Sequence, residues 1–348
     1  MARKLASSPT VWRLARDLGL KAVPNAMSAI IAYCDRRIRD FLKDFPRASS
    51  VDELLEIAAN RVGTIFEIVS HDADLSRIID TYTGRGERAF ANLHQELSGP
   101  TTFGITFRLT RREEFDLPYV SVIDCRGSKA ARTYFTKWHE VGHLLLLTDQ
   151  TRLQFYRTHS HLDDRDPEEA LVDVVAGRFA FFAPLLQRQA TGEPSFERIE
   201  RLRQELCPAA SRQAALIGIA TAWKEPLLLV RAAPALRKAD EPVAGQAGFD
   251  FAPKPKAALR AVKVTPNESA RQSDLLIHSN MRVPERSVIH TVFNRAFGHD
   301  GADEDLSWWE AGDGTVLSKR AVRVEARYLA GGVDALVFDL PNRTRKAS

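Results

Sequence analysis

The stretch TKWHEVGHLLLLTD, residues 136–149, sets two histidines beside a run of apolar residues. The spacing of the apolar residues in and around it predicts a long helix over residues 128–147. On that helix His139 and His143 lie one turn apart and project from the same face. Glu140 lies about 100° round the helix from His139, so its carboxylate stands beside that face. The two imidazoles can therefore reach one ion, and Glu140 can stand beside that ion without binding it.

Two imidazoles at this spacing can bind one zinc ion, with bonds of about 2.0–2.1 Å. Glu140 is then the predicted catalytic base, since it can take a proton from water that the ion has made more acidic. The pattern HExxH also arises by chance, in roughly one chain per hundred of this composition, so a structural histidine pair is the alternative. Two features favour the metal. Gly142 leaves room for another segment, and a buried His-Glu-His face without an ion carries a desolvation cost.

A catalytic zinc ion usually has three protein ligands and one open position, so a third ligand should lie downstream. A polar loop is predicted at 151–166, followed by a second helix from about Pro167, on which Glu169 and Asp173 lie one turn apart. Asp173 lies within an apolar stretch, where an unpaired carboxylate is costly, so we expect it to have a partner. The downstream candidates are His159, His161, Asp163, Asp164, Glu168, Glu169 and Asp173.

The chain before the histidines predicts helices and strands in alternation. Residues 1–45 predict helices with an apolar stripe, and Ser50 with Glu53 forms a capping-box pattern that opens the next helix. A further helix is predicted at about 74–97. Three segments rich in β-branched and aromatic residues predict strands: 64–70, 101–109 and 118–125.

The second half of the chain changes from helical to mainly β patterns. Two helices are predicted at 195–207 and 211–223, and residues 238–258 have the Pro, Gly and Lys content of a linker. Gly331-Gly332 predicts a hairpin turn. Five segments beyond the linker predict short strands: 259–265, 273–279, 287–293, 321–329 and 333–340. The expected fold class is α+β.

The whole chain of 348 residues is long enough for two or three domains. We expect neither a membrane span nor a signal peptide, because charges interrupt every apolar stretch. Cys34, Cys125 and Cys207 lie far apart, which fits a reducing cytoplasm better than a disulfide framework. The net charge of +4 is compatible with nucleic-acid contact but does not argue for it.

The two motifs together resemble the ImmA/IrrE family of metallopeptidases. That family has FTxxHExxH on one helix and, a loop later, a helix of the pattern ExxANxFAA before an apolar run that ends in proline. Residues 135–143 match the first motif in full, and the second motif corresponds to residues 173–180. The resemblance implies that Asp173 is the third zinc ligand, where the family has a glutamate. Glu169 is the second choice.

The likeness extends along the chain and implies its domain organisation. The catalytic part is a zincin-like metallopeptidase domain with a small β-sheet, and the subtype is the IrrE-like one of radiation and stress responses. The implied domains are an N-terminal helical extension (1–45), the zinc metallopeptidase domain (46–192), a helical, helix-turn-helix-like region (193–237), a linker (238–258) and a β-rich, GAF-like domain (259–348).

The resemblance implies a cytoplasmic zinc endopeptidase with one zinc ion per chain. The implied substrate is a helix-turn-helix transcriptional repressor, cleaved to induce a DNA-damage-type stress response or a mobile-element response. The alternative is a metal-stabilised DNA-binding or ligand-sensing regulator without peptidase activity. Arginines in the helix pair could contact phosphates, and Trp308 with Trp309 could line a sensor pocket. A charged helical face and a hydrophobic core are the simpler interpretations.

Overall fold

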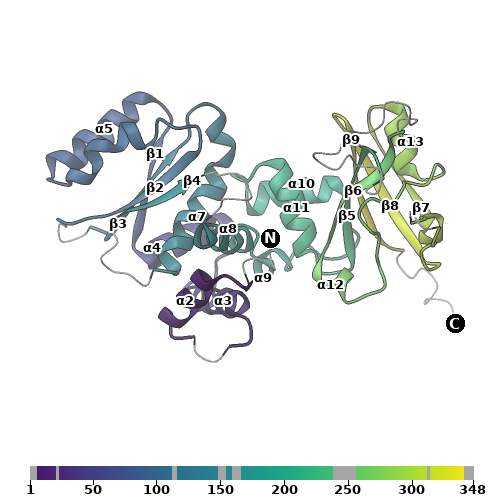
Figure 1. The fold of residues 1–348 in the computed structure, drawn as a ribbon, viewed down its shortest axis with the longest axis horizontal. Coiled ribbons are helices and arrows are strands. Elements are labelled where there is room, and N and C mark those ends of the chain that lie inside the picture. Colours follow the sequence, from purple (N-terminus) through teal and green to yellow (C-terminus); the bar gives the residue numbers. More distant parts are fainter. Residues whose placement is uncertain are drawn as a thin grey trace, which may run out of the picture. The chain divides into compact units, whose positions relative to one another are not determined.

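The computed structural model describes residues 6–20, 23–111, 116–147, 154–158, 166–237, 256–311 and 314–340, with the backbone alone described at 154–158. The chain divides into two compact units, Met1–Leu185 with Glu205–Ser211, and Leu186–Gln204 with Arg212–Ser348. Each unit contains its own sheet (Figure 1), and the fold class is α+β as predicted. Among the residues described, every helix is too short or too polar to cross a bilayer.

The first unit contains a mixed sheet in the order β1-β3-β2-β4. Its strands are β1 (Thr64–Val69), β2 (Thr102–Arg108), β3 (Tyr119–Asp124) and β4 (Gln154–Thr158). β1 is parallel to β3, whereas β2 is antiparallel to both β3 and β4. The first three strands are confirmed. The prediction of a continuous loop at 151–166 was wrong at β4, because backbone bonds to β2 hold this edge strand without an apolar alternation.

One face of this sheet packs against α5 (Asp72–Gly84), the 3₁₀ turn η1 (Arg88–Asn92) and α6 (Leu93–Glu96). The strands contribute Ile105, Phe107, Val120 and Val122 to this core. The single helix predicted at about 74–97 is therefore broken. The break follows Gly84, and Gly86 adopts a left-handed φ of 88°, which ends a helix.

The other face packs against α4 (Val51–Val62) and α7 (Thr133–Leu145), and α8 (Pro167–Phe179) packs on α7. The short helix α9 (Ala183–Leu186) follows. Ser50 and Glu53 form both bonds of the predicted capping box on α4. The predicted helix at 128–147 is confirmed from Thr133, and its first residues form the 3₁₀ turn η2 (Gly127–Arg132).

The N-terminal segment contributes two helices, α2 (Pro9–Asp17) and α3 (Ala26–Lys43), and both contact α8. Along α3 the fully buried residues recur every four positions, at Ala26, Ile30, Cys34 and Ile38. This stripe anchors α3 in the first unit by burial of apolar side chains.

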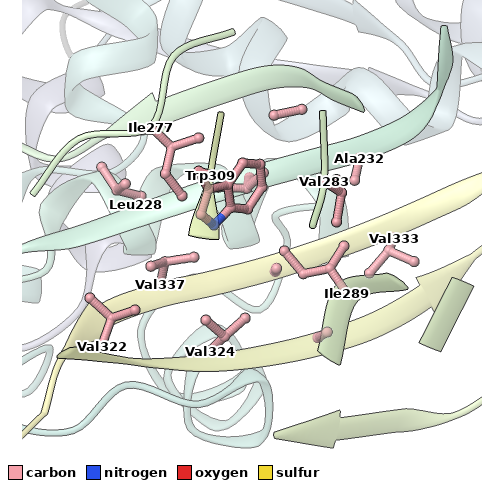
Figure 2. Packing of buried hydrophobic residues seen from close by; sticks show 14 of the residues in the cluster. Leu228, Ala232, Ile277, Val283, Ile289, Trp309, Val322, Val324, Val333 and Val337 are labelled. Atoms are coloured by element: carbon pink, nitrogen blue, oxygen red, sulfur yellow. The ribbon is translucent and has the colours of Figure 1, made fainter. Parts of the chain in front are cut away.

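The second unit contains an antiparallel sheet in the order β6-β5-β9-β8-β7. Figure 2 shows Trp309 among apolar side chains of these strands. β8 and β9 pair Leu329 with Gly332, so the predicted hairpin is confirmed and turns at Ala330-Gly331. The strands are β5 (Leu227–Ala235), β6 (Ala258–Pro266), β7 (His299–Asp305), β8 (Ala321–Leu329) and β9 (Gly332–Asp339).

Two predicted strands of this unit were wrong. Residues 273–279, all described, form no strand, and residues 287–293 fall in a helix, α13 (Val288–Arg295). Ser287 caps α13 by accepting from Ile289 N at 3.2 Å, while Glu304 accepts from Val288 N at 2.7 Å. These bonds satisfy the first amides of the helix, and they outweigh the strand preference of its β-branched residues.

The predicted helix pair is confirmed as α10 (Phe196–Leu206) and α11 (Arg212–Ala222). The segment 193–237, however, also contains β5, which pairs with β6 and β9. Its run of Leu and Val thus joins the second sheet rather than extending the helical region. Most of the predicted linker, residues 238–255, lies outside the described residues.

Candidate metal centre

Helix α7 presents His139, Glu140 and His143 from its buried side, where they are 1%, 0% and 2% exposed. Gly142 allows this burial. A Cβ there would lie 3.1 Å from Val172 Cγ1 of α8, so the glycine lets α8 approach between the histidines, as predicted. The face of α7 is thus closed against α8 on one side and against β2 on the other.

The two histidines meet Glu169, from the first turn of α8, at a single point. The Nε2 atoms of His139 and His143 are 3.1 Å apart, Glu169 Oε2 is 3.2 Å from His139 Nε2, and Glu169 Oε1 is 3.1 Å from His143 Nε2. Ligands at about 2.0–2.1 Å from a tetrahedral zinc ion lie about 3.3–3.4 Å from one another. These buried, converging donor atoms therefore fit one zinc ion.

Asp173 contacts the other nitrogen of His139. Its Oδ1 lies 2.9 Å from His139 Nδ1, and this contact is the partner that its apolar setting led us to expect. A histidine that donates from Nδ1 to a carboxylate presents the lone pair of Nε2, which is the usual arrangement of a metal-ligating histidine. The geometry therefore favours Glu169 as the third ligand and Asp173 as the residue that orients His139, although the assignment stays a prediction.

The two glutamates of the site differ in their affinity for protons. Burial raises the pKa of Glu169, but hydrogen bonds with His139 and His143 outweigh it and hold the pKa below its usual range. Burial raises the pKa of Glu140, against the smaller opposing effects of the two histidines and Thr106. The raised pKa of Glu140 suits a base that accepts a proton.

Buried hydroxyl groups of the sheet position the carboxylate of Glu140. Thr106 Oγ1 donates to Glu140 Oε2 at 2.7 Å, and Ser121 Oγ lies 2.6 Å from Thr106 Oγ1. Thr64 Oγ1 lies 2.8 Å from Ser121 Oγ. An ionised carboxylate only accepts, so Thr106 must donate to it and must in turn accept from Ser121. The chain of hydroxyls fixes Oε2 and aims the carboxylate.

The second oxygen, Oε1, is buried and has no hydrogen-bond partner among the described residues. It lies against β2 at Gly104, where an added Cβ would come within 2.9 Å of it and within 2.8 Å of Thr136 Cγ2. Glycine at this position is therefore what allows α7 to lie so close to the strand. Because it lacks a described partner, Oε1 is available to accept a proton.

Thr106→Val is expected to lower kcat about ten- to hundredfold and to leave KM and zinc content unchanged. The reason is that valine keeps the shape but removes the charge-assisted bond that orients Glu140. Steady-state kinetics check the effect, with Thr106→Ser expected to restore kcat and Thr102→Val, at another buried threonine of β2, as the matched control. An unchanged kcat for Thr106→Val would show that the hydroxyl plays no part.

Thr64, Gly104, Thr106 and Ser121 were missed at the level of sequence. The alternation of residues along β2 could have identified Gly104 and Thr106. Its residues Ile105 and Phe107 face the apolar core, while Gly104 and Thr106 alternate with them on a face that is also buried. Small or hydroxyl-bearing residues on a buried sheet face indicate a closely packed helix with a polar group to satisfy.

The remaining predicted candidates do not join the described centre. His159, His161, Asp163 and Asp164 lie outside the described residues, and Glu168 is not part of the group formed by His139, His143 and Glu169. Trp309 is 1% exposed in the core of the second unit. The arginines of the helix pair have local partners: Arg201 pairs with Glu197, Arg203 and Arg212 pair with Glu200, and Arg198 lies over the ring of Trp223.

No family model matches the chain, and no curated protein is detectably similar to it. The centre therefore rests on its own geometry, in which the HxxxH pair and Glu169 resemble a zincin site.

Proposed function

We propose that this protein is a zinc-dependent endopeptidase. One observation supports it above all: His139, His143 and Glu169 direct their ligand atoms at one point, within 4.8 Å of one another, and Glu140 stands beside them. Zinc bound there would supply Lewis acidity towards a peptide carbonyl and would make water more acidic.

The residues of the chain then have distinct roles. Glu140 takes the proton from the attacking water at Oε1, the oxygen without a described partner, and returns it to the leaving amine. Thr106 holds the other oxygen, so the carboxylate is already aimed before substrate arrives. Asp173 fixes the ring of His139 through Nδ1, which keeps Nε2 directed at the ion.

We further propose that the chain acts as an IrrE-like member of the ImmA/IrrE metallopeptidases in the cytoplasm and cleaves a helix-turn-helix repressor. Support comes from the FTKWHEVGH match and from the second helix at Asp173. The second unit, with its antiparallel sheet and packed helices, is consistent with a GAF-like domain. Hydrolysis of a peptide bond does not need such a unit, whereas recognition of a folded partner or a signal does. Direct DNA binding is the weaker alternative: the arginines of the helix pair have local partners, although Arg201 and Arg212 are largely exposed.

The zinc-loaded chain is expected to cut the helix-turn-helix repressor encoded beside its gene at one site and to leave casein almost intact. Specificity of this kind follows if substrate recognition lies outside the metal centre. The measurement is mass spectrometry of the products, with chelator-treated protein as the control and added zinc restoring activity. Equal cutting by chelated protein would contradict the zinc mechanism, and indiscriminate cutting of casein would contradict the specificity.

A further inference from the structure

Helix α3 touches both helices that supply the metal ligands. Its Arg37 donates through Nη1 to the carbonyl oxygen of Leu145 at 3.0 Å, in the last turn of α7 and two residues after His143. Its Asp35 accepts from Arg178 of α8 at 2.7 Å and 2.5 Å, through Nε and Nη2. Helix α3 is thus bonded to both α7 and α8.

Both contacts belong to strong classes of interaction. The Leu145 carbonyl is in the last turn of a helix, where no intrahelical amide remains to bond it and a cation is favoured. The Arg178–Asp35 pair is bidentate, which fixes its geometry; the Asp35 side chain is 14% exposed and that of Arg178 is 49% exposed. The buried stripe of α3 keeps Asp35 and Arg37 in place.

A zinc site depends on where α8 sits against α7. His139 and His143 come from α7, and the carboxylates come from α8, while ligand distances must hold to about 0.2 Å. Gly142 and Val172 set one contact between the two helices. Asp35 and Arg37 add a second, indirect link between α7 and α8. Asp35 binds Arg178 of α8, Arg37 binds the end of α7, and both residues belong to α3.

We propose that α3 is a positioning element of the metal centre: Arg37 and Asp35 hold α8 against α7 so that Glu169 stays within reach of an ion on His139 and His143. The inference rests on the proposed zinc site. It assigns to the N-terminal segment a role in metal affinity, rather than in general stability alone.

The test uses the full chain and Zn²⁺ in competition with a chromophoric chelator. The double variant Asp35→Asn/Arg37→Met is expected to bind zinc roughly tenfold more weakly, as when groups supporting a ligand are lost. The visible spectrum of bound Co²⁺ is expected to change as well, because the ligand geometry shifts. Arg37→Lys, which keeps the donor and charge, and the exchange Asp35→Arg/Arg178→Asp, which rebuilds the pair, should both recover affinity.

The matched control is Asp44→Asn. Asp44 follows α3 and pairs with Arg61 of α4, so this variant removes an ion pair at the same helix without touching α8. Thermal unfolding of the zinc-free proteins shows that each variant is folded. Wild-type affinity in the double variant, or an equal loss in Asp44→Asn, would overturn the positioning role alone. A wild-type chain that binds no zinc would overturn both this inference and the proposed function.

Discussion

Glu140→Gln is expected to bind zinc as the wild-type chain does and to lose peptide-bond cleavage by about 10²–10⁴-fold. Glutamine has nearly the same shape, which matters at a position that is 0% exposed and packed against Gly104. Its amide oxygen can still accept from Thr106, so the side chain should stay in place. What is lost is the basic oxygen that takes a proton from water.

The measurement pairs kcat on the repressor with the zinc content of the same preparation. Glu56→Gln is the matched control, since Glu56 is exposed on α4 of the same unit. Equal cutting by Glu140→Gln and wild type would remove Glu140 from the mechanism. Loss of zinc in Glu140→Gln would instead mean that the carboxylate is a ligand, and the free oxygen Oε1 would then have to be reinterpreted.

Elements held by local interactions could be predicted from the sequence. The capping box at Ser50 and Glu53 involves neighbouring residues, and the helical spacing of His139 and His143 is a property of α7 alone. Helix α13 could not be predicted in the same way. Its first amide is bonded by Glu304, a residue of β7 that a local pattern cannot connect to it. Where distant groups complete an element, the propensity of its own residues is a weak guide.

The residues of the candidate site divide in the same way, into those set by local sequence and those set by contacts between distant segments. The α7 residues follow from one motif. Thr106 reaches Glu140 because α7 packs on β2, and Ser121 reaches Thr106 because β2 and β3 pair in a particular register. The choice between Glu169 and Asp173 as the third ligand could be predicted from the sequence only in part. Both lie on one face of α8, and the alignment with the family pattern favoured Asp173, while the positions of the histidine nitrogens favour Glu169. Sequence spacing places both residues near the ion but does not say which nitrogen each one meets.

Glu169→Ala is expected to weaken zinc binding by much more than Asp173→Ala. Glu169 directs one oxygen at each histidine Nε2, so its loss removes a donor from the ion itself. Asp173 meets the Nδ1 side of His139, so its loss only loosens the ring and should weaken binding by roughly 10–100-fold. Zinc titration against a chelator ranks the two variants.

Glu168→Ala is the matched control for this ranking, because Glu168 precedes Glu169 on α8 and is not part of the ligand group. Both test substitutions remove a carboxylate from the same face of one helix. An effect on folding that the two variants share therefore cancels in the ratio of their zinc affinities. The reverse order, with Asp173→Ala losing zinc and Glu169→Ala retaining it, would mean that α8 rotates when the ion binds. The third ligand would then be the residue that the family pattern places there, and Glu169 would act as the supporting carboxylate.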